Sequence, residues 1–249
     1  MLGIVIQARL GSKRLPNKML LPFYEGKGVL ELLIEDLLIN FNNLPIIIAT
    51  TGSIRDDPII KLCLKHKVNY YRGSETNVLE RFVDVANKFS LKKIIRVCAD
   101  NPFLNMEYLN ILIQNFSKSD ADYLSFQTSK NIPVIRTHYG FWAEGVTLEA
   151  LKKIQRNTNK AIYLEHVTNF IYENSVEFKI EFTNIDSFIE QHNSIRMTLD
   201  TYEDYLLLKE IYSKYILLER TTLRSLIDFV YANNTWLEKM NLQILNNIK

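Results

Sequence analysis

Five short apolar runs rich in Ile and Val recur along the first half of the chain. Between them lie longer segments whose apolar residues repeat every three or four positions. The short runs are typical of strands buried on both faces, and the longer segments are typical of amphipathic helices. The alternation predicts βαβ units and a mostly parallel sheet. The predicted strands cover 2–8, 45–50, 68–73, 92–100 and 121–127, and the predicted helices cover 26–41, 56–67, 77–89 and 106–118.

Beyond residue 127 the pattern is less regular, and no linker, repeat or low-complexity segment divides the chain. We therefore expect one domain with an inserted or appended lobe. The alternation over 176–185 is typical of an exposed antiparallel strand, and the Asn-rich last dozen residues are expected to fray. The other predicted elements are a strand running into a helix over 140–155, a helix over 161–175, a strand over 194–200, and helices over 202–213 and 221–233.

Composition narrows the class of protein. The chain has 249 residues, of which 47% are hydrophobic, and its net charge of +2 argues against a dedicated nucleic-acid binder. The two cysteines, Cys63 and Cys98, support neither a disulfide framework nor a Cys-rich zinc site. No apolar run has the length needed to span a membrane, and no signal peptide is recognisable. We expect a cytoplasmic protein without membrane insertion.

The loop over residues 9–18 leaves the first predicted strand and is strongly basic. It lacks the glycine pattern of a dinucleotide-binding fold and the lysine motif of a P-loop. Several cations with free backbone amides suit a triphosphate better than a single phosphate, although a basic surface turn is the alternative reading. The cations are Arg9, Lys13, Arg14 and Lys18.

Two aspartates end predicted strands. Asp100 ends the strand over 92–100, and Asp200 ends the strand over 194–200. Ligands of parallel sheets bind at the carboxyl ends of the strands, where carboxylates can hold the Mg²⁺ that accompanies a triphosphate. Helix capping is the alternative role for both residues. Asp100 is followed by Asn101 and Pro102 rather than by the D-x-D of many glycosyltransferases.

Six ordered blocks resemble a known family: "VIQARLGSKRLPNKML", "ATTGSIRDDPI", "YRGSETNVLERF", "IIRVCADNPFL", "LEHVTNFIYE" and "MTLDTYEDYLLL". They are similar to the cytidylyltransferases that activate acidic sugars, of the 3-deoxy-manno-octulosonate and acylneuraminate type, and particularly to the SpsF-like branch of spore-coat polysaccharide biosynthesis. The resemblance covers about residues 3–210.

The resemblance implies an α/β GT-A-like nucleotide-diphospho-sugar transferase fold, with a Rossmann-like sheet flanked by helices. The nucleotide-binding part would cover about 1–127 and 195–235, and an acceptor and dimerisation lobe about 128–194. The implied reaction transfers CMP from CTP to a sugar acid or a phosphorylated small molecule, with Mg²⁺ as cofactor and release of pyrophosphate. The implied role is in surface polysaccharides such as capsule or lipopolysaccharide, and the protein would be a homodimer.

The resemblance also assigns roles to individual residues. The triphosphate would be held by Arg9, Arg14 and Lys18 with the backbone around Ala8, Gly11 and Ser12. The cytidine would be enclosed by Arg72, Gly73, Ser74 and Arg81. The metal would bind Asp100 and Asp200, which with Arg9 and Lys18 form the catalytic set. The acceptor would meet Glu144, Glu165 and His166.

The chain departs from the SpsF-like pattern at two positions. Asn105 stands where a second aspartate is usual, and Trp142 replaces an acid two residues before Glu144. An aromatic residue there predicts a changed acceptor pocket, although core packing would also explain it. Two other functions stay open, a glycosyltransferase of the same general fold and a non-catalytic nucleotide-binding subunit.

Overall fold

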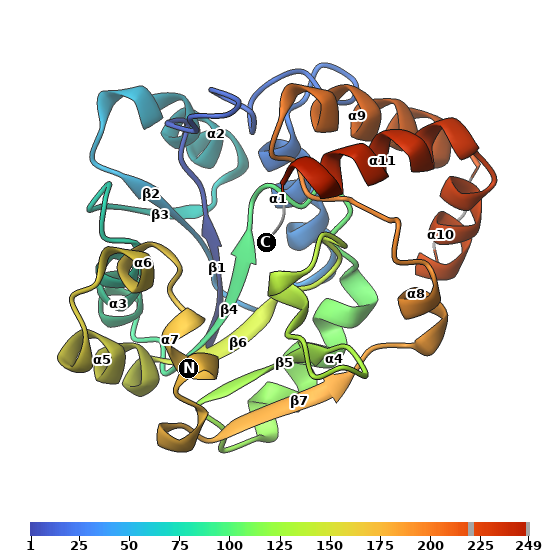
Figure 1. Ribbon diagram of the computed structural model, residues 1–249. Coiled ribbons are helices and arrows are strands. Elements are labelled where there is room, and N and C mark those ends of the chain that lie inside the picture. The colour runs from blue at the N-terminus through green and yellow to red at the C-terminus, as the bar shows by residue number, and fades with distance from the viewer. Residues whose placement is uncertain (219–221, 248–249) are drawn as a thin grey trace.

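The computed structural model describes residues 1–218 and 222–247, and these form an α/β protein around a seven-stranded sheet (Figure 1). The strand order is β3-β2-β1-β4-β6-β5-β7. All five strands predicted in the first half are present. The strands are β1 (Leu2–Gln7), β2 (Ile46–Thr51), β3 (Asn69–Gly73), β4 (Lys93–Cys98), β5 (Tyr123–Gln127), β6 (Glu144–Thr147) and β7 (Ile180–Asn184).

The helices connect these strands, and the four predicted in the first half are found. The α-helices are α1 (Val29–Asn40), α2 (Asp57–His66), α3 (Val78–Lys88), α4 (Met106–Lys118), α5 (Leu148–Asn157), α6 (Ala161–Glu165), α7 (Asn169–Glu173), α8 (Ser187–Gln191), α9 (Tyr202–Ile216), α10 (Leu223–Tyr231) and α11 (Asn234–Asn246). The 3₁₀ turns are η1 (Ile54–Asp56), η2 (Val134–Arg136) and η3 (Ser175–Glu177).

The sheet is mostly parallel, as predicted. β1 pairs in parallel with β2 and β4, and β2 pairs in parallel with β3. Only β6, within the described part of the chain, runs against both of its neighbours. The carboxyl ends of β1 to β4 therefore share one edge of the sheet, and the loops that follow them meet there.

β7 is parallel to β5, so the prediction of an antiparallel strand over 176–185 is wrong. β6 ends at the edge where β5 begins, and α5 to α7 return the chain to that edge, so β7 sets out in the same direction as β5. The alternating pattern correctly indicated an exposed edge but does not encode direction. β6 and β7, both from the segment expected as a lobe, join the main sheet.

Residues 194–200 form no strand, so that prediction is also wrong. This segment is buried, and two of its backbone hydrogen bonds reach other loops, from Met197 N to the carbonyl of His138 and from Leu199 N to the carbonyl of Asp100 (both 2.9 Å). It crosses loops rather than joining the sheet. Asp200 therefore reaches the sheet edge on an irregular segment, immediately before the Thr201 cap of α9.

Three helix predictions need adjustment. The helix expected over 161–175 is split into α6 and α7, because the backbone at His166 leaves the helical region. The chain up to Asn246 forms α11 instead of fraying, since Trp236 and Met240 are buried in the core, and positions 248–249 lie outside the described residues. The helix expected over 221–233 corresponds to α10, and position 221 lies outside the described residues.

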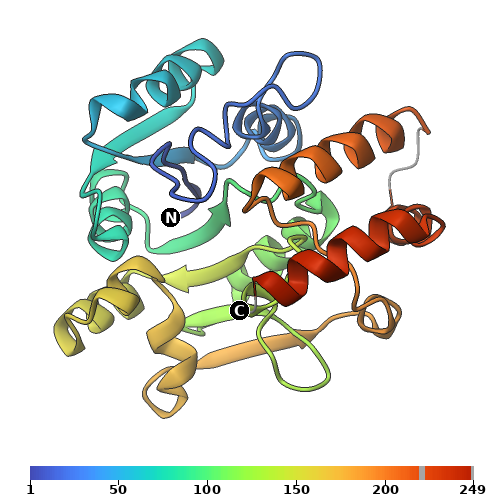
Figure 2. The same ribbon diagram turned by 45° about the horizontal axis from the view of Figure 1, so that its top comes forward.

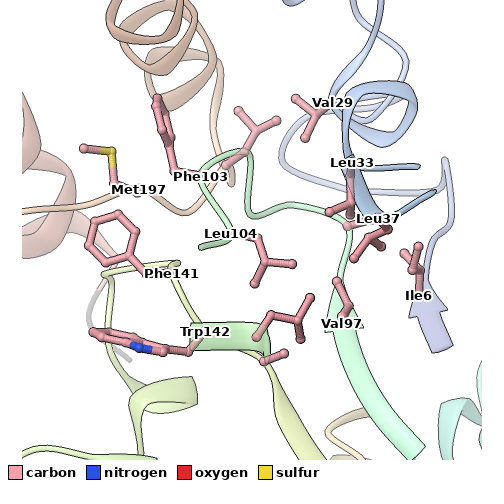
Figure 3. Packing of buried hydrophobic residues seen from close by; sticks show 14 of the residues in the cluster. Ile6, Val29, Leu33, Leu37, Val97, Phe103, Leu104, Phe141, Trp142 and Met197 are labelled. Atoms are coloured by element: carbon pink, nitrogen blue, oxygen red, sulfur yellow. The ribbon is translucent and has the colours of Figure 1, made fainter. Parts of the chain in front are cut away.

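Two apolar clusters cover the two faces of the sheet. On one face the α1 residues Val29, Leu33 and Leu37 point toward Ile6 and Val97 of the sheet (Figure 3). The helices α2, α4 and α9 to α11 contribute to the same cluster, and α9 and α11 lie side by side (Figure 2). The opposite face packs against α3, α5 and α7. Burial on both faces explains the continuous apolar strands.

Candidate active site

The opening loop is fixed by Asp56, a fully buried residue from the turn after β2. Its carboxylate accepts hydrogen bonds from Leu10 N (2.8 Å), from Thr51 N (3.3 Å), and from the hydroxyls of Thr50 (3.2 Å) and Thr51 (2.5 Å). Asp56 directly precedes α2, but its side chain makes no cap hydrogen bond to that helix. The carboxylate instead holds the start of the loop against β2.

Lys18 joins the two predicted metal-binding aspartates. Its ammonium donates hydrogen bonds to Asp100 Oδ2 (2.8 Å) and to the carbonyl of Leu199 (2.6 Å), and it lies 3.7 Å from Asp200 Oδ1. The Lys18 side chain is only 8% exposed. Burial alone would lower the pKa of Lys18, but the two carboxylates outweigh it and raise the pKa above its ordinary value. Lys18 is therefore a cation at the junction of both acids.

Arg14 contacts Asp200, one of the two aspartates, from the solvent side. One guanidinium nitrogen lies 2.8 Å from Asp200 Oδ1, and another donates to Asn247 Oδ1 (3.2 Å). The second oxygen of Asp200 accepts from Arg196 (3.0 Å). Arg14, Lys18, Asp100 and Asp200, predicted from distant parts of the sequence, thus form one cluster.

A buried network orients Asp200. The guanidinium of Arg196 lies 2.8 Å from both oxygens of Asp204 and contacts His138 Nδ1 at 2.6 Å. Asp204 in turn accepts from the backbone nitrogens of Asp200 and Thr201 (both 3.0 Å), the latter as part of a capping box. Because Asp204 and Arg196 fix its backbone and one oxygen, Asp200 is left with one oxygen turned toward Lys18 and Arg14.

Arg9 lies apart from this cluster. Its guanidinium donates to Glu165 Oε1 of α6 (2.9 Å) and to the carbonyl of Glu75 (3.3 Å). The contact joins the opening loop to the predicted acceptor side. Arg9, predicted to bind phosphate, and Glu165, predicted to bind the acceptor, therefore neutralise each other.

The cytidine-side residues fall into two environments. Arg72 donates to the carbonyls of Thr51 (3.0 Å) and Ser53 (2.6 Å) and pairs with Asp57 (2.8 Å), so it braces the turn before α2. Arg81 is fully buried, and its only hydrogen bond among the described residues is a long one to the carbonyl of Ala49 (3.5 Å). Burial lowers the pKa of Arg81 to about 10. Two guanidinium nitrogens of Arg81, Nε and Nη2, therefore have no hydrogen-bond partner among the described residues.

The small residues of the predicted nucleotide side shape the backbone. Ala8 is buried and bonds through its nitrogen to the carbonyl of Ala49 (3.2 Å). The hydroxyls of Ser12 and Ser74 accept from backbone nitrogens three residues later. A Cβ at Gly73 would lie 3.1 Å from the Arg81 side chain, and one at Gly11 would lie 3.2 Å from Arg55. A larger residue would therefore be crowded at Gly73, whereas at Gly11 the exposed Arg55 side chain could move aside.

A cavity of about 500 Å³ opens beside the aspartate cluster. Five predicted site residues line it: Arg14, Asp100, Asp200, Glu165 and His166. Partial burial lowers the pKa of His166, with Glu165 opposing and Arg96 adding to the effect, so the imidazole is neutral at pH 7. The remaining predicted nucleotide-side residues lie outside this cavity's lining.

Glu144 faces a buried network instead of the cavity. It forms an ion pair with Arg96 on β4, the residue opposite it in the sheet, and accepts from the hydroxyls of Thr168 (2.9 Å) and Tyr123 (2.5 Å). Arg96 itself lines the cavity. Glu144 therefore reaches the cavity only through the guanidinium that it holds.

Residues 3–243 match the cytidylyltransferase family. The chain belongs to that family. The spore coat polysaccharide biosynthesis protein SpsF of Bacillus subtilis is 31% identical over 215 residues, which cover 84% of this chain and 85% of the relative. The resemblance of the six sequence blocks is thereby confirmed, and the chain is a nucleotidyltransferase.

Solved structures of cytidylyltransferases share the fold. One from Leptospira borgpetersenii has a TM-score of 0.83 and 26% identity, over 95% of this chain and 96% of that one. A CMP:2-keto-3-deoxy-manno-octonic acid synthetase complexed with CTP has a TM-score of 0.64 at 14% identity, over 86% and 99% of the two chains. The predicted GT-A-like fold is confirmed. No described helix of this cytidylyltransferase is both long and apolar enough to cross a membrane.

Both departures from the family pattern have structural explanations. Asn105 caps α4 by accepting from Tyr108 N (2.9 Å). Trp142 is 4% exposed and packs edge-to-face against Tyr108, Tyr139 and Phe141, yet it also lines the cavity. Trp142 therefore presents an apolar surface to the cavity where the family pattern has an acid.

Several residues of this cytidylyltransferase site were missed by the sequence analysis. Cys98 is half-buried and lines the cavity two residues before Asp100. The sequence does contain a signal for the position of Cys98. Arg96, Cys98 and Asp100 stand at alternate positions along β4 and the turn after it, so their side chains share one face. Arg196 and Asp204 carried no such local signal. Other missed cavity residues are Gln7, Arg136, Asn169, Tyr172 and Asn247.

Proposed function

We propose that this protein transfers CMP from CTP to an anionic small-molecule acceptor, a sugar acid or a phosphorylated small molecule, and releases pyrophosphate. The observation that carries the proposal is the Lys18 ammonium between Asp100 and Asp200. Cations and carboxylates that neutralise one another beside a cavity are the groups that a triphosphate and its metal would engage. Family membership supports CTP as the nucleotide.

Several basic residues would bind the triphosphate, each in a different way. Lys18 is buried and positioned by three oxygens, so it supplies a fixed charge beside the reacting phosphorus. Arg14 is more exposed and can exchange its pairing with Asp200 for a phosphate oxygen. Arg9 would do the same by releasing Glu165. The amides around Gly11 and Ser12 would add neutral donors.

Asp100 and Asp200 would hold Mg²⁺. Both carboxylates lie beside the Lys18 ammonium, and carboxylate oxygens are the ligands that Mg²⁺ prefers. Mg²⁺ bound there would neutralise phosphate charge and lower the pKa of an attacking hydroxyl. The network of Arg196 and Asp204 keeps Asp200 aimed at this position without any contribution from the metal.

The main contribution of the protein to this reaction would be to position the reactants. The acceptor oxygen attacks the α-phosphorus, the new P–O bond forms, and the bond to the pyrophosphate oxygen breaks in line. Lys18 and Arg14 would stabilise the charge that develops on the departing pyrophosphate. Arg81, with unsatisfied buried donors, would bind the nucleoside. The cavity lined by Glu165 and His166 would hold the acceptor.

Three broader points belong to the same proposal. The similarity to SpsF supports a role in surface polysaccharide synthesis, of which capsule and lipopolysaccharide are two forms. A cytoplasmic location is proposed because the enzyme would need a supply of CTP. A homodimer, formed through the segment 128–194, is proposed from the resemblance to the sugar-activating cytidylyltransferases.

A pyrophosphate-release assay tests the proposed function. The protein is incubated with Mg²⁺, each of the four nucleoside triphosphates, and a panel of sugar acids, phosphorylated sugars and neutral sugars. We expect pyrophosphate with CTP and at least one anionic acceptor. CTP binding is measured separately by calorimetry. Absence of both turnover and CTP binding would refute the proposal. Binding of a nucleotide-sugar in preference to CTP would favour a glycosyltransferase. CTP binding without any turnover would favour a non-catalytic subunit.

A further inference from the structure

Both carboxylate oxygens of Asp200 are in contact with cations. Oδ2 accepts hydrogen bonds from the guanidinium of Arg196 (3.0 Å) and from the hydroxyl of Thr198 (3.3 Å). Oδ1 accepts a hydrogen bond from Arg14 (2.8 Å) and lies 3.7 Å from the Lys18 ammonium. The Asp200 side chain is only 9% exposed. A metal ion that approaches Asp200 therefore meets an oxygen that already lies beside a positive charge.

The three cations differ in how easily they can leave this carboxylate. Arg196 and Lys18 are almost completely buried, and each is also bound to a second acid, Asp204 and Asp100 respectively. Moving either one would separate a buried ion pair, which is costly. Arg14 is 55% exposed, so its guanidinium can turn toward a ligand without leaving a buried charge behind. Arg14 is therefore the cation that a ligand can remove.

A metal ion and the Arg14 guanidinium would compete for Asp200 Oδ1. Mg²⁺ and Mn²⁺ bind carboxylate oxygens at roughly 2.1 Å, and the guanidinium nitrogen is 2.8 Å from the same oxygen. Two cations so close to one another repel, and the repulsion is weakly screened beside a side chain that is mostly buried. Arg14 is also one of the proposed ligands of the triphosphate. One side chain thus contacts the proposed metal site and belongs to the proposed nucleotide site.

We infer that Arg14 couples metal binding to nucleotide binding. The inference rests on the proposed function and describes how its site is regulated. While Arg14 is paired with Asp200, a divalent metal binds weakly. A triphosphate that takes the guanidinium opens Asp200 Oδ1 to the metal, so the metal binds tightly once the nucleotide is present. By linkage the metal favours the nucleotide by the same factor. Asp100 is not controlled in this way, because its printed partner is Lys18 and its side chain is 29% exposed.

Mn²⁺ binding to the nucleotide-free protein tests the coupling without any turnover. The Kd is measured by electron paramagnetic resonance of the free ion. Arg14→Ala should lower the Kd for Mn²⁺ by roughly tenfold, which lies within the usual range for coupled sites. Arg14→Lys keeps a charge beside Asp200 and should stay near the Kd of the parent protein. Lys13→Ala removes the neighbouring exposed charge of the same loop and is the matched control, with a change of no more than about twofold.

The expected gain in metal affinity separates this inference from a folding effect, since a damaged site would bind Mn²⁺ less tightly. An unchanged or higher Kd in Arg14→Ala would overturn the inference. An equal gain in Lys13→Ala would also overturn it, because the general charge of the loop would then be responsible. Adding Asp200→Asn to Arg14→Ala should abolish the gain, and a gain that persists would count against the inference as well. Failure of the parent protein to bind CTP would instead count against the proposed function.

Discussion

The ammonium of Lys18 lies 2.8 Å from the Asp100 carboxylate, at the point where the opening loop meets the end of β4. Lys18 is almost completely buried, whereas the Asp100 side chain is 29% exposed toward the cavity. The pair therefore has a buried cation and an acid that still faces the ligand. If the proposed function holds, substrates enter a site whose charges are already positioned, which lowers the reorganisation needed for transfer.

Asp100→Asn tests the acid of this pair. The amide keeps the shape of the side chain but loses the charge that would bind the metal, so turnover should fall roughly a hundredfold or more, a loss of several kcal/mol of transition-state stabilisation. Pyrophosphate release measures the effect, and circular dichroism should show an unchanged fold. Asp120→Asn, at an exposed surface acid paired with Lys179, is the control. Near-normal turnover in Asp100→Asn would remove Asp100 from the proposed metal site.

Arg14→Ala should mainly weaken CTP binding. Its guanidinium is more than half exposed and paired with Asp200, so it can transfer to a phosphate without disturbing the core. Loss of a charge-assisted hydrogen bond predicts a rise in Kd of roughly ten- to a hundredfold. Calorimetry with CTP gives the value. Lys13→Ala, next to it on the same loop and also exposed, should leave the Kd unchanged. Equal effects of the two substitutions would show that only the general charge of the loop matters.

The sequence predicted the parts of the site that depend on local pattern and fold class. Asp100 and Lys18 follow recognisable strands, and parallel strands bring their carboxyl ends together. Residues 194–200 were misread because a buried irregular segment and a buried strand have the same apolar pattern. The contact between Arg196 and Asp204 depends on how α9 begins beside that segment, and the contact between Asp56 and Leu10 depends on how the opening loop packs beside β2. Such tertiary contacts leave no periodic signal in one sequence.

Glu165→Gln tests whether the bridge between α6 and the opening loop competes with the nucleotide. Glu165 and Arg9 are partly exposed (52% and 33%), so their pairing contributes only up to about 1 kcal/mol. Freeing Arg9 and removing a negative charge should tighten CTP binding by about fivefold. Glu173→Gln, at the end of α7 and outside the cavity lining, is the control. Weaker CTP binding in Glu165→Gln would mean that Glu165 supports the nucleotide site instead of blocking it.

Glu144→Gln tests the buried support behind the cavity. Glu144 is 1% exposed and neutralises Arg96, whose guanidinium is also buried, so the substitution leaves a buried charge without its partner. Breaking such a pair typically costs about 3–5 kcal/mol of the free energy of unfolding. Urea denaturation measures this loss. Glu149→Gln, a 72% exposed acid that follows β6 on α5, should change the value by no more than about 0.5 kcal/mol. If the double variant Arg96→Met/Glu144→Gln regains most of the lost stability, the unpaired guanidinium is the cause. If it is no more stable than Glu144→Gln, the loss comes from the hydrogen bonds to Tyr123 and Thr168.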